Sequence, residues 1–278
     1  MIVNTPIQML VDNLLVKRED LQRSGSFKIR GVLNVLLEGP EAIRDVVVAS
    51  TGNTALAACD LSTEFNLKVK ACIPANVGAA KRAALKRCDA DIIEVSGGFA
   101  RTAKVAQSLA REIGAQYISP GSDALFAVGN ATVCAEILDS RPHIEQIVVP
   151  CGGGGLIVGI GSYARAHPAH PRVVGVQLAE SPYLYQLLKR GSAQGVVETP
   201  TTIESLAGEL EDDALAYSEL ARVCDDIVLV SEARARDAQE LFFAKTRTWI
   251  DLGAAAAVAG AEELESIATC VVVTGRAR

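Results

Sequence analysis

The sequence Ile147-Val148-Val149-Pro150-Cys151-Gly152-Gly153-Gly154-Gly155-Leu156-Ile157-Val158-Gly159 contains four consecutive glycines between two apolar runs. The β-branched run before the glycines predicts a buried strand, and the apolar run after them predicts a helix. Four glycines cost backbone entropy, which favours a loop that a ligand approaches closely, although a tight structural turn would also use them. Backbone N–H groups at a helix start bind phosphate, so this loop is a candidate phosphate site.

The same alternation of strand and helix extends along the chain. Strands are predicted at 14–17, 46–49, 69–73, 92–95, 147–150, 173–177, 227–230 and 271–274. Helices are predicted near 26–38, 53–64, 78–88, 98–112, 124–139, 154–166, 182–190, 231–246 and 253–264. Several strands are continuously apolar, which indicates that helices cover both faces of their sheet. The sequence therefore predicts an α/β fold with mainly parallel sheets.

The strand–helix units at 45–115 are expected to form a small domain, with 1–44 and 116–278 together forming a discontinuous large domain. The segment at about 191–225 is rich in Gly, Ser, Pro and acidic residues, and predicts irregular surface with a short helix. Its acidic cluster is interpreted as a solvated loop or helix start. The members of this cluster are Glu209, Glu211, Asp212 and Asp213.

A second motif, Ser24-Gly25-Ser26-Phe27-Lys28-Ile29-Arg30-Gly31, places a lysine after an aromatic ring at the start of a predicted helix. A helical lysine is most often a solvated surface residue. A partly desolvated lysine close to a cofactor phosphate instead has a lowered pKa, which imine formation requires. Together, the lysine and the glycine loop suggest pyridoxal 5′-phosphate, because that cofactor carries both an aldehyde and a phosphate. Phe27 offers a ring beside the lysine.

Two further motifs place polar residues where strands end. Ala49-Ser50-Thr51-Gly52-Asn53-Thr54-Ala55 ends one strand and opens a helix, so its hydroxyls and N–H groups suit a carboxylate. A plain N-capped turn would have the same composition. Thr274 ends the last strand, at the carboxyl edge where ligands bind in open α/β sheets. An ordinary strand-end threonine is the alternative there.

The composition excludes several classes of protein. The 278 residues carry a net charge of −6 and no basic stripe, so nucleic acid is not expected as a partner. No apolar run is long enough for a membrane span and the N-terminus does not resemble a signal peptide, so a cytoplasmic location is expected. The seven cysteines are scattered without a C-x-x-C pair, which predicts buried thiols in a reducing compartment and no zinc ribbon.

In this order the motifs resemble the fold-type II pyridoxal phosphate enzymes, the tryptophan synthase β-like superfamily. The resemblance covers nearly the whole chain. The stretches that look like threonine and serine dehydratases are Lys17-Arg18-Glu19-Asp20-Leu21-Gln22, Ser26 to Gly31, residues 129–137 (Gly-Asn-Ala-Thr-Val-Cys-Ala-Glu-Ile) and the glycine loop. The resemblance implies two open, twisted, mainly parallel sheets flanked by helices, with the cofactor held by the large domain. It also implies a homodimer acting on a small amino acid.

The resemblance also implies roles for individual residues. Lys28 would form the Schiff base with the cofactor and move protons during the reaction. The cofactor would also contact Phe27, Asn53 through its phenolic oxygen, Thr274 through its pyridine nitrogen, and Gly152, Gly153, Gly154 and Gly155 through its phosphate. The substrate carboxylate would lie against Ser50, Thr51, Gly52 and Thr54. Gln177 occupies the place of a metal-binding glutamate, so no metal is expected.

The sequence departs from the dehydratase pattern in three places. The Ser-Thr-Gly-Asn-Thr loop at 50–54 is closer to that of threonine and cysteine synthases, the dehydratase glutamate is missing unless Asp251 replaces it, and Gly275 is not followed by Gly-Asn. The leading hypothesis is an ammonia-lyase that removes the β-hydroxyl of a small hydroxy-amino acid, giving a 2-oxo acid and ammonia. The alternatives are a β- or γ-replacement synthase, and a degenerate homologue that binds cofactor or amino acid without turnover.

Overall fold

The computed structural model describes residues 2–11, 13–39, 43–50, 52–75, 77–88 and 90–277. The described strands are β1 (Ile7–Val11), β2 (Leu14–Arg18), β3 (Asp45–Ala49), β4 (Lys68–Pro74), β5 (Asp91–Val95), β6 (Gln116–Ile118), β7 (Gln146–Pro150), β8 (Arg172–Leu178), β9 (Asp226–Val230) and β10 (Thr269–Val273). The helices are α1 (Lys28–Glu38), α2 (Asn53–Phe65), α3 (Ala79–Arg87), α4 (Phe99–Ile113), α5 (Ala124–Ser140), α6 (Gly155–Ala166), α7 (Tyr183–Arg190), α8 (Ala216–Val223), α9 (Glu232–Thr246) and α10 (Leu252–Ala261). A short 3₁₀ helix, η1 (Glu19–Leu21), follows β2.

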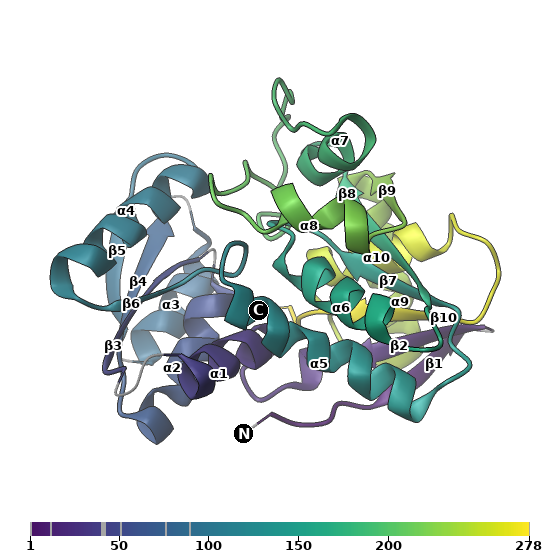
Figure 1. Cartoon of the computed structure of the whole chain (residues 1–278), viewed down its shortest axis with the longest axis horizontal. Coiled ribbons are helices and arrows are strands. Elements are labelled where there is room, and N and C mark those ends of the chain that lie inside the picture. Colours follow the sequence, from purple (N-terminus) through teal and green to yellow (C-terminus); the bar gives the residue numbers. More distant parts are fainter. Residues whose placement is uncertain are drawn as a thin grey trace.

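These elements form two sheets, which confirms the predicted α/β class. One sheet has the order β1-β2-β10-β7-β8-β9 and the other has the order β5-β4-β3-β6. Every pairing is parallel except the one between β1 and β2. Figure 1 shows the sheets side by side, with α1 and α5 running between them. Because the strands are parallel, the loops after them gather at one edge of each sheet.

Two strands of the structure are absent from the sequence-based prediction. β1 lies at an open edge, where Met9 is 69% exposed, so its apolar residues do not form the continuous run of a covered strand. β6 contains only three residues and pairs with β3, which places it in the smaller sheet. The proposed division into a small domain at 45–115 and a large domain stays a prediction.

Alternate residues of a central strand enter different cores, which explains the continuous apolar runs. In β10, Val271 and Val273 pack in a cluster that contains the alanines of α10. Cys270 and Val272 join the largest cluster, which includes Ile157 of α6. Both sets are fully buried. Helices therefore cover the larger sheet on both faces, as a parallel sheet requires.

The smaller sheet follows the same rule and shares a core with the larger one. In β3, Val47 packs in a cluster with Ala106 of α4, whereas Val48 joins the largest cluster. That cluster also contains Ile147 of β7, so one continuous apolar core reaches from the smaller sheet to the larger one. α1 contacts both α2 and α5 and helps to fill the space between the sheets.

Among the described helices, none combines the length and the apolar composition needed to cross a bilayer. The seven cysteines are free thiols, and all except the partly exposed Cys88 are buried.

A buried network of charges joins the chain start to α1 and α5. Arg30 has no exposed surface, and its guanidinium donates to Glu19 at 2.7 and 2.8 Å and to Glu136 at 2.8 and 2.7 Å. Lys17 is also fully buried and donates to Glu136 and to the Thr5 carbonyl oxygen. The Thr5 hydroxyl donates to Glu19 at 2.6 Å. Each buried charge thus has an opposite partner and several hydrogen bonds, which such groups need when they are removed from water.

We expect Arg30→Met to lower the free energy of unfolding by about 3–5 kcal/mol, because it leaves Glu19 charged, buried and without its partner. Arg23→Met is the matched control, since Arg23 pairs with Asp60 and Glu64 at a more exposed position. Arg23→Met should lower the free energy of unfolding by no more than about 1 kcal/mol. Urea unfolding of both variants measures the difference, and equal losses would contradict the importance of the buried network.

Candidate functional site

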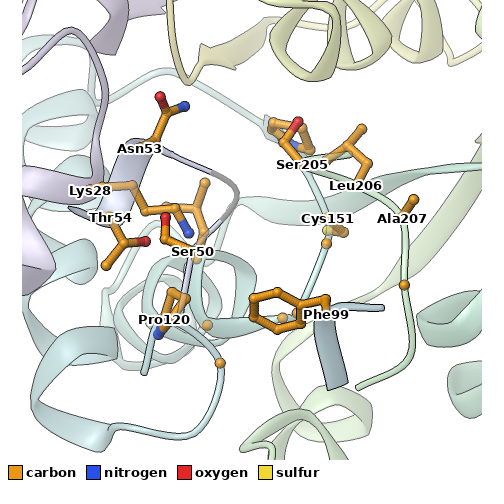
Figure 2. A pocket seen from close by; sticks show the side chains of 18 of the residues that line it. Lys28, Ser50, Asn53, Thr54, Phe99, Pro120, Cys151, Ser205, Leu206 and Ala207 are labelled. Atoms are coloured by element: carbon orange, nitrogen blue, oxygen red, sulfur yellow. The ribbon is translucent and has the colours of Figure 1, made fainter. Parts of the chain in front are cut away.

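A cleft lies at the carboxyl edges of both sheets and encloses about 1010 Å³ of empty space, including its open mouth. Ligand sites of open α/β folds lie at such strand ends. The described residues that line it are Phe27, Lys28, Ala49, Ser50, Asn53, Thr54, Phe99, Pro120, Gly121, Pro150 to Ile157, Glu204 to Glu211, Asp251 and Thr274. Figure 2 shows Lys28 reaching into the cleft beside Ser50 and Thr54, with Ser205, Leu206 and Ala207 across from them.

Lys28 is the first residue of α1. In space, this helix begins beside the carboxyl end of β10, the last strand in the sequence. The Phe27 N–H donates to the Thr274 carbonyl oxygen at 3.1 Å, so the chain is pinned to the end of β10 just before the helix begins. Lys28 Nζ lies 4.7 Å from the centre of the Phe27 ring and 5.7 Å from that of Phe126. The helix is two residues shorter at its start than the sequence predicts.

The environment of Lys28 shifts its protonation equilibrium toward the neutral amine. Desolvation by the surrounding protein lowers the pKa of Lys28 to about 8, and the charges of Glu211 and Asp251 partly oppose this change. Near neutral pH a larger fraction of this amine is therefore unprotonated than of an ordinary lysine, and that fraction can act as a nucleophile or a base.

Three of the four glycines in the loop are required by the packing of the protein itself. A Cβ at Gly152 would lie 2.4 Å from the Ser205 carbonyl oxygen, and one at Gly155 would lie 2.0 Å from that of Pro120. Gly154 has a φ of +91°, a left-handed conformation that side chains disfavour. At Gly153 a Cβ would meet only Gly121, with its Cα at 3.7 Å, so this glycine is open toward the cleft.

The loop at 50–54 opens α2 on the other side of Lys28. The Ser50 hydroxyl accepts hydrogen bonds from the N–H groups of Gly52 at 2.8 Å and Ala55 at 3.4 Å. Gly52 has a φ of +137° and is not among the lining residues, whereas Ser50, Asn53 and Thr54 are. Thr51 lies outside the described residues. The structure thus brings two of the four predicted substrate residues, Ser50 and Thr54, to the same cleft as Lys28, together with Asn53.

The C-terminal segment adds Thr274 and an aspartate to the cleft. Asp251 caps α10 by accepting the Ala254 N–H at 2.8 Å, and its other oxygen lies 3.5 Å from the Asn53 amide nitrogen. A Cβ at position 275 would lie 2.3 Å from this Asp251 oxygen. The Asp251 carboxyl can therefore lie this close to the backbone only because residue 275 is glycine. Asp251 therefore lies beside Asn53, in the region where the dehydratase glutamate is missing.

The interpretation of the acidic cluster at 209–213 as a solvated loop is wrong for Glu211. This residue is only 7% exposed and lines the cleft, where it receives hydrogen bonds from the Ser119 and Tyr117 hydroxyls. Glu209, Asp212 and Asp213 are exposed, as predicted. Residues 204–211 also form one wall of the cleft, so this part of the segment is not simply irregular surface. The sequence contains one sign that this segment is packed, which is the spacing of its apolar residues. Ile203, Leu206 and Leu210 are all buried in the structure.

No metal centre is formed by the part of the chain that the structure describes, since no group of three or more His, Cys, Asp or Glu side chains converges. Gln177, which is predicted to take the place of a metal-binding glutamate, accepts the Tyr185 N–H at 3.0 Å. Its carbonyl oxygen is thus used to fix the start of α7.

A lysine and a glycine loop at a helix start line one cleft between two mainly parallel sheets, an arrangement that suits a cofactor-dependent α/β enzyme. The family model described as pyridoxal-phosphate dependent enzyme matches residues 2–275. The chain belongs to this family, and its fold is that of the fold-type II members.

Individual relatives support this assignment. An L-threonine ammonia-lyase of Thermotoga maritima is 31% identical over 227 residues, which cover 81% of this chain and 56% of the relative. The catabolic L-threonine dehydratase TdcB of Escherichia coli is 32% identical over 234 residues, covering 81% and 68%. The structure of maize serine racemase matches with a TM-score of 0.89 and 25% identity, covering 99% of this chain and 88% of that one. The chain spans about half the length of the curated relatives it first matches.

The residues of the cleft fit pyridoxal phosphate. Gly155, Leu156 and Ile157 form the first turn of α6, where backbone N–H groups have no partner within the helix, and all three line the cleft. Gly153 leaves room for a phosphate to reach them. Lys28 supplies an amine with a lowered pKa in the same cleft. A phosphate and an aldehyde on one molecule can therefore be held together.

Alanine substitutions should separate the two uses of the glycine loop. Gly155→Ala forces a Cβ against the Pro120 carbonyl oxygen and should cost about 1–3 kcal/mol of stability. Gly153→Ala should leave stability within about 0.5 kcal/mol but weaken pyridoxal phosphate binding by at least about tenfold. Thermal melts and cofactor titrations measure both effects. Unchanged cofactor affinity in Gly153→Ala would show that phosphate does not approach this glycine.

The rate at which pyridoxal phosphate combines with the apoprotein should rise with pH and level off above about 8, the pKa of Lys28. The reason is that only the unprotonated amine attacks an aldehyde, and desolvation favours that form. Stopped-flow absorbance at a series of pH values measures the rate. Nα-acetyl-lysine is the control and should level off near about 10.4, the ordinary value for lysine. A protein curve that coincides with this control would contradict the lowered pKa.

Proposed function

We propose that this chain is an ammonia-lyase that removes the β-hydroxyl of a small amino acid such as serine or threonine, giving a 2-oxo acid and ammonia. The observation that carries the proposal is the position of Lys28, whose amine lies in one cleft with two helix starts, those of α2 and α6. Both helix starts favour anions, which suits a substrate carboxylate and a cofactor phosphate. The dehydratase relatives support the choice of reaction.

When bound, pyridoxal phosphate supplies an aldehyde for the amino group and an electron sink next to the α-carbon. Gly152, Gly153, Gly154 and Gly155 would hold its phosphate, together with the first turn of α6. Phe27, Asn53 and Thr274 would hold the ring, with Asn53 at the phenolic oxygen and Thr274 at the pyridine nitrogen. Thr274 offers a neutral hydroxyl there, which does not force that nitrogen to be protonated as an aspartate would.

The remaining roles belong to the substrate side of the cleft. Ser50, Thr51 and Thr54 would hold the α-carboxylate and so orient the Cα–H bond toward Lys28, whereas the Gly52 N–H is already donated to the Ser50 hydroxyl. The Lys28 amine would then take the α-proton, a role that its lowered pKa supports. Loss of the β-hydroxyl follows from the same arrangement, because the electrons released at the α-carbon can expel it.

Two broader properties belong to this proposal. We propose a homodimer, on the resemblance to fold-type II enzymes, and a cytoplasmic location, to which the seven free thiols lend support. A smaller lobe that closes over the bound substrate would exclude water from the cleft.

Lys28→Ala should abolish the visible absorbance of the protein-linked cofactor and lower kcat for serine or threonine by at least about 10³-fold. The reason is that both the covalent link and the base are lost. Lys189→Ala is the control, since Lys189 is a surface residue paired with Asp226. Absorbance spectra and 2-oxo acid release measure the outcome, and unchanged turnover in Lys28→Ala would refute the mechanism.

A substrate panel separates this reaction from its alternatives. The wild-type enzyme is incubated with serine, threonine, O-acetylserine and O-phosphohomoserine, each with and without a thiol. Release of 2-oxo acid without a thiol supports the lyase. Product that forms only with the thiol supports a replacement synthase, for which the Ser-Thr-Gly-Asn-Thr loop is the motivating feature. Inversion of serine without 2-oxo acid supports a racemase, and spectral change without product supports a binding homologue.

A further inference from the structure

One buried carboxyl group in the cleft has no role in the mechanism described so far. Glu211 is 7% exposed, lines the cleft, and is close enough to Lys28 for its charge to affect the pKa of the lysine. A buried carboxyl in a site that must also receive a phosphate and a carboxylate is electrostatically unfavourable unless it carries a proton at some stage.

The hydrogen bonds around Glu211 have a fixed direction. The Ser119 hydroxyl accepts the N–H groups of Gly121 at 3.1 Å and Ser122 at 3.0 Å, so its own proton points to Glu211 Oε1 at 2.6 Å. The Tyr117 hydroxyl donates to Oε2 at 3.0 Å. These donors stabilise the carboxylate form, whereas burial disfavours it and, with the charge of Asp213, raises the pKa of Glu211 overall. The Glu211 carboxyl can therefore carry a proton, and hydrogen bonds from the two hydroxyls stabilise its anion after the proton is lost.

The other carboxyls that line the described part of the cleft are less suited to proton transfer. Asp251 uses one oxygen to cap α10 and places the other near Asn53. Glu209 is exposed, so its carboxylate is solvated, and Glu204 is partly exposed. Glu211 is the carboxyl among them that is buried and also hydrogen-bonded by hydroxyl groups.

We propose that Glu211 donates the proton that converts the departing β-hydroxyl into water. The inference rests on the proposed elimination reaction. The α-proton passes to Lys28, the Cβ–O bond breaks with its electron pair on oxygen, and the Glu211 O–H bond breaks as its proton joins that oxygen. The products are the unsaturated amino acid skeleton, water, and a Glu211 carboxylate held by Ser119 and Tyr117. Solvent at the open mouth then returns a proton to Glu211.

The test compares two substrates that differ only in whether the leaving group needs a proton. Hydroxide leaves L-serine poorly without an acid, whereas chloride leaves β-chloro-L-alanine unaided. Glu211→Gln should lower kcat/KM for L-serine by about 10²–10⁴-fold, the usual contribution of a general acid, and leave that for β-chloro-L-alanine within about threefold. Equal losses for both substrates, or no loss for L-serine, would overturn the proposal. Absorbance of the bound cofactor verifies that the variant holds it.

Asp212→Asn is the matched control, because it makes the same change at the next residue, whose side chain is exposed and pairs with Lys104. It should leave both activities unchanged. If the wild type eliminated neither leaving group, the ammonia-lyase proposal itself would be wrong. If the wild type eliminated both leaving groups, and Glu211→Gln changed kcat/KM for the two substrates by the same factor, only the role of Glu211 would be wrong.

A second pair of variants keeps the test valid if Glu211→Gln does not fold. Tyr117→Phe and Ser119→Ala retain the Glu211 carboxyl but each removes one hydroxyl that stabilises its anion. Each should lower kcat/KM for L-serine by about tenfold and leave that for β-chloro-L-alanine unchanged, because weaker stabilisation of the anion opposes proton release. A loss that is the same for both substrates would contradict a role in protonating the leaving group.

Discussion

The position of the reactive amine depends on a buried ion network formed two residues away. Arg30 is held between Glu19 and Glu136, which ties the first turn of α1 to the chain start and to α5. Burial alone would raise the pKa of Glu136, but its hydrogen bonds with Arg30 and Lys17 lower it overall, so the carboxyl remains charged. Breaking such a buried pair is costly, because it leaves a charge without its partner. Together with the hydrogen bond from the Phe27 N–H to the Thr274 carbonyl oxygen, this network anchors the first turn of α1, to which Lys28 belongs.

The cleft is lined by residues that follow strands of both sheets, so neither sheet alone would form it. The start of α6 follows β7 of the larger sheet, and the start of α2 follows β3 of the smaller one. Each helix start favours an anion, and Lys28 lines the same cleft on a helix that contacts α2 and α5. Under the proposed function, a ligand with a phosphate at one end and a carboxylate at the other would bridge the two sheets. The largest apolar cluster also spans both sheets, so any closure of the smaller lobe must be compatible with that shared core.

Features that depend on local sequence could be predicted, whereas features that depend on distant neighbours could not. The strands and helices follow from continuous apolar runs and glycine breaks, and Lys28 and the glycine loop were recognisable from short motifs. The burial of Glu211 is hard to predict from local sequence, because the only signal is the apolar spacing of the preceding residues and its neighbours Asp212 and Asp213 are acidic and exposed. Its burial arises from Tyr117 and Ser119, which are about ninety residues earlier in the chain. Edge strand β1 was missed for a related reason, since its environment is set by its pairing with β2.

In the glycine run, a tight structural turn and a proposed phosphate loop are compatible explanations. Gly152 and Gly155 allow the backbone to approach Ser205 and Pro120, which is a structural requirement of the protein. That close packing places the first turn of α6 at the floor of the cleft, where its N–H groups remain available. Gly153 adds nothing to the packing, and its lack of a side chain keeps the way to these groups open. Under the proposed function the tight turn and the phosphate loop would be one structure, because the turn would form the binding surface and one further glycine would leave it accessible.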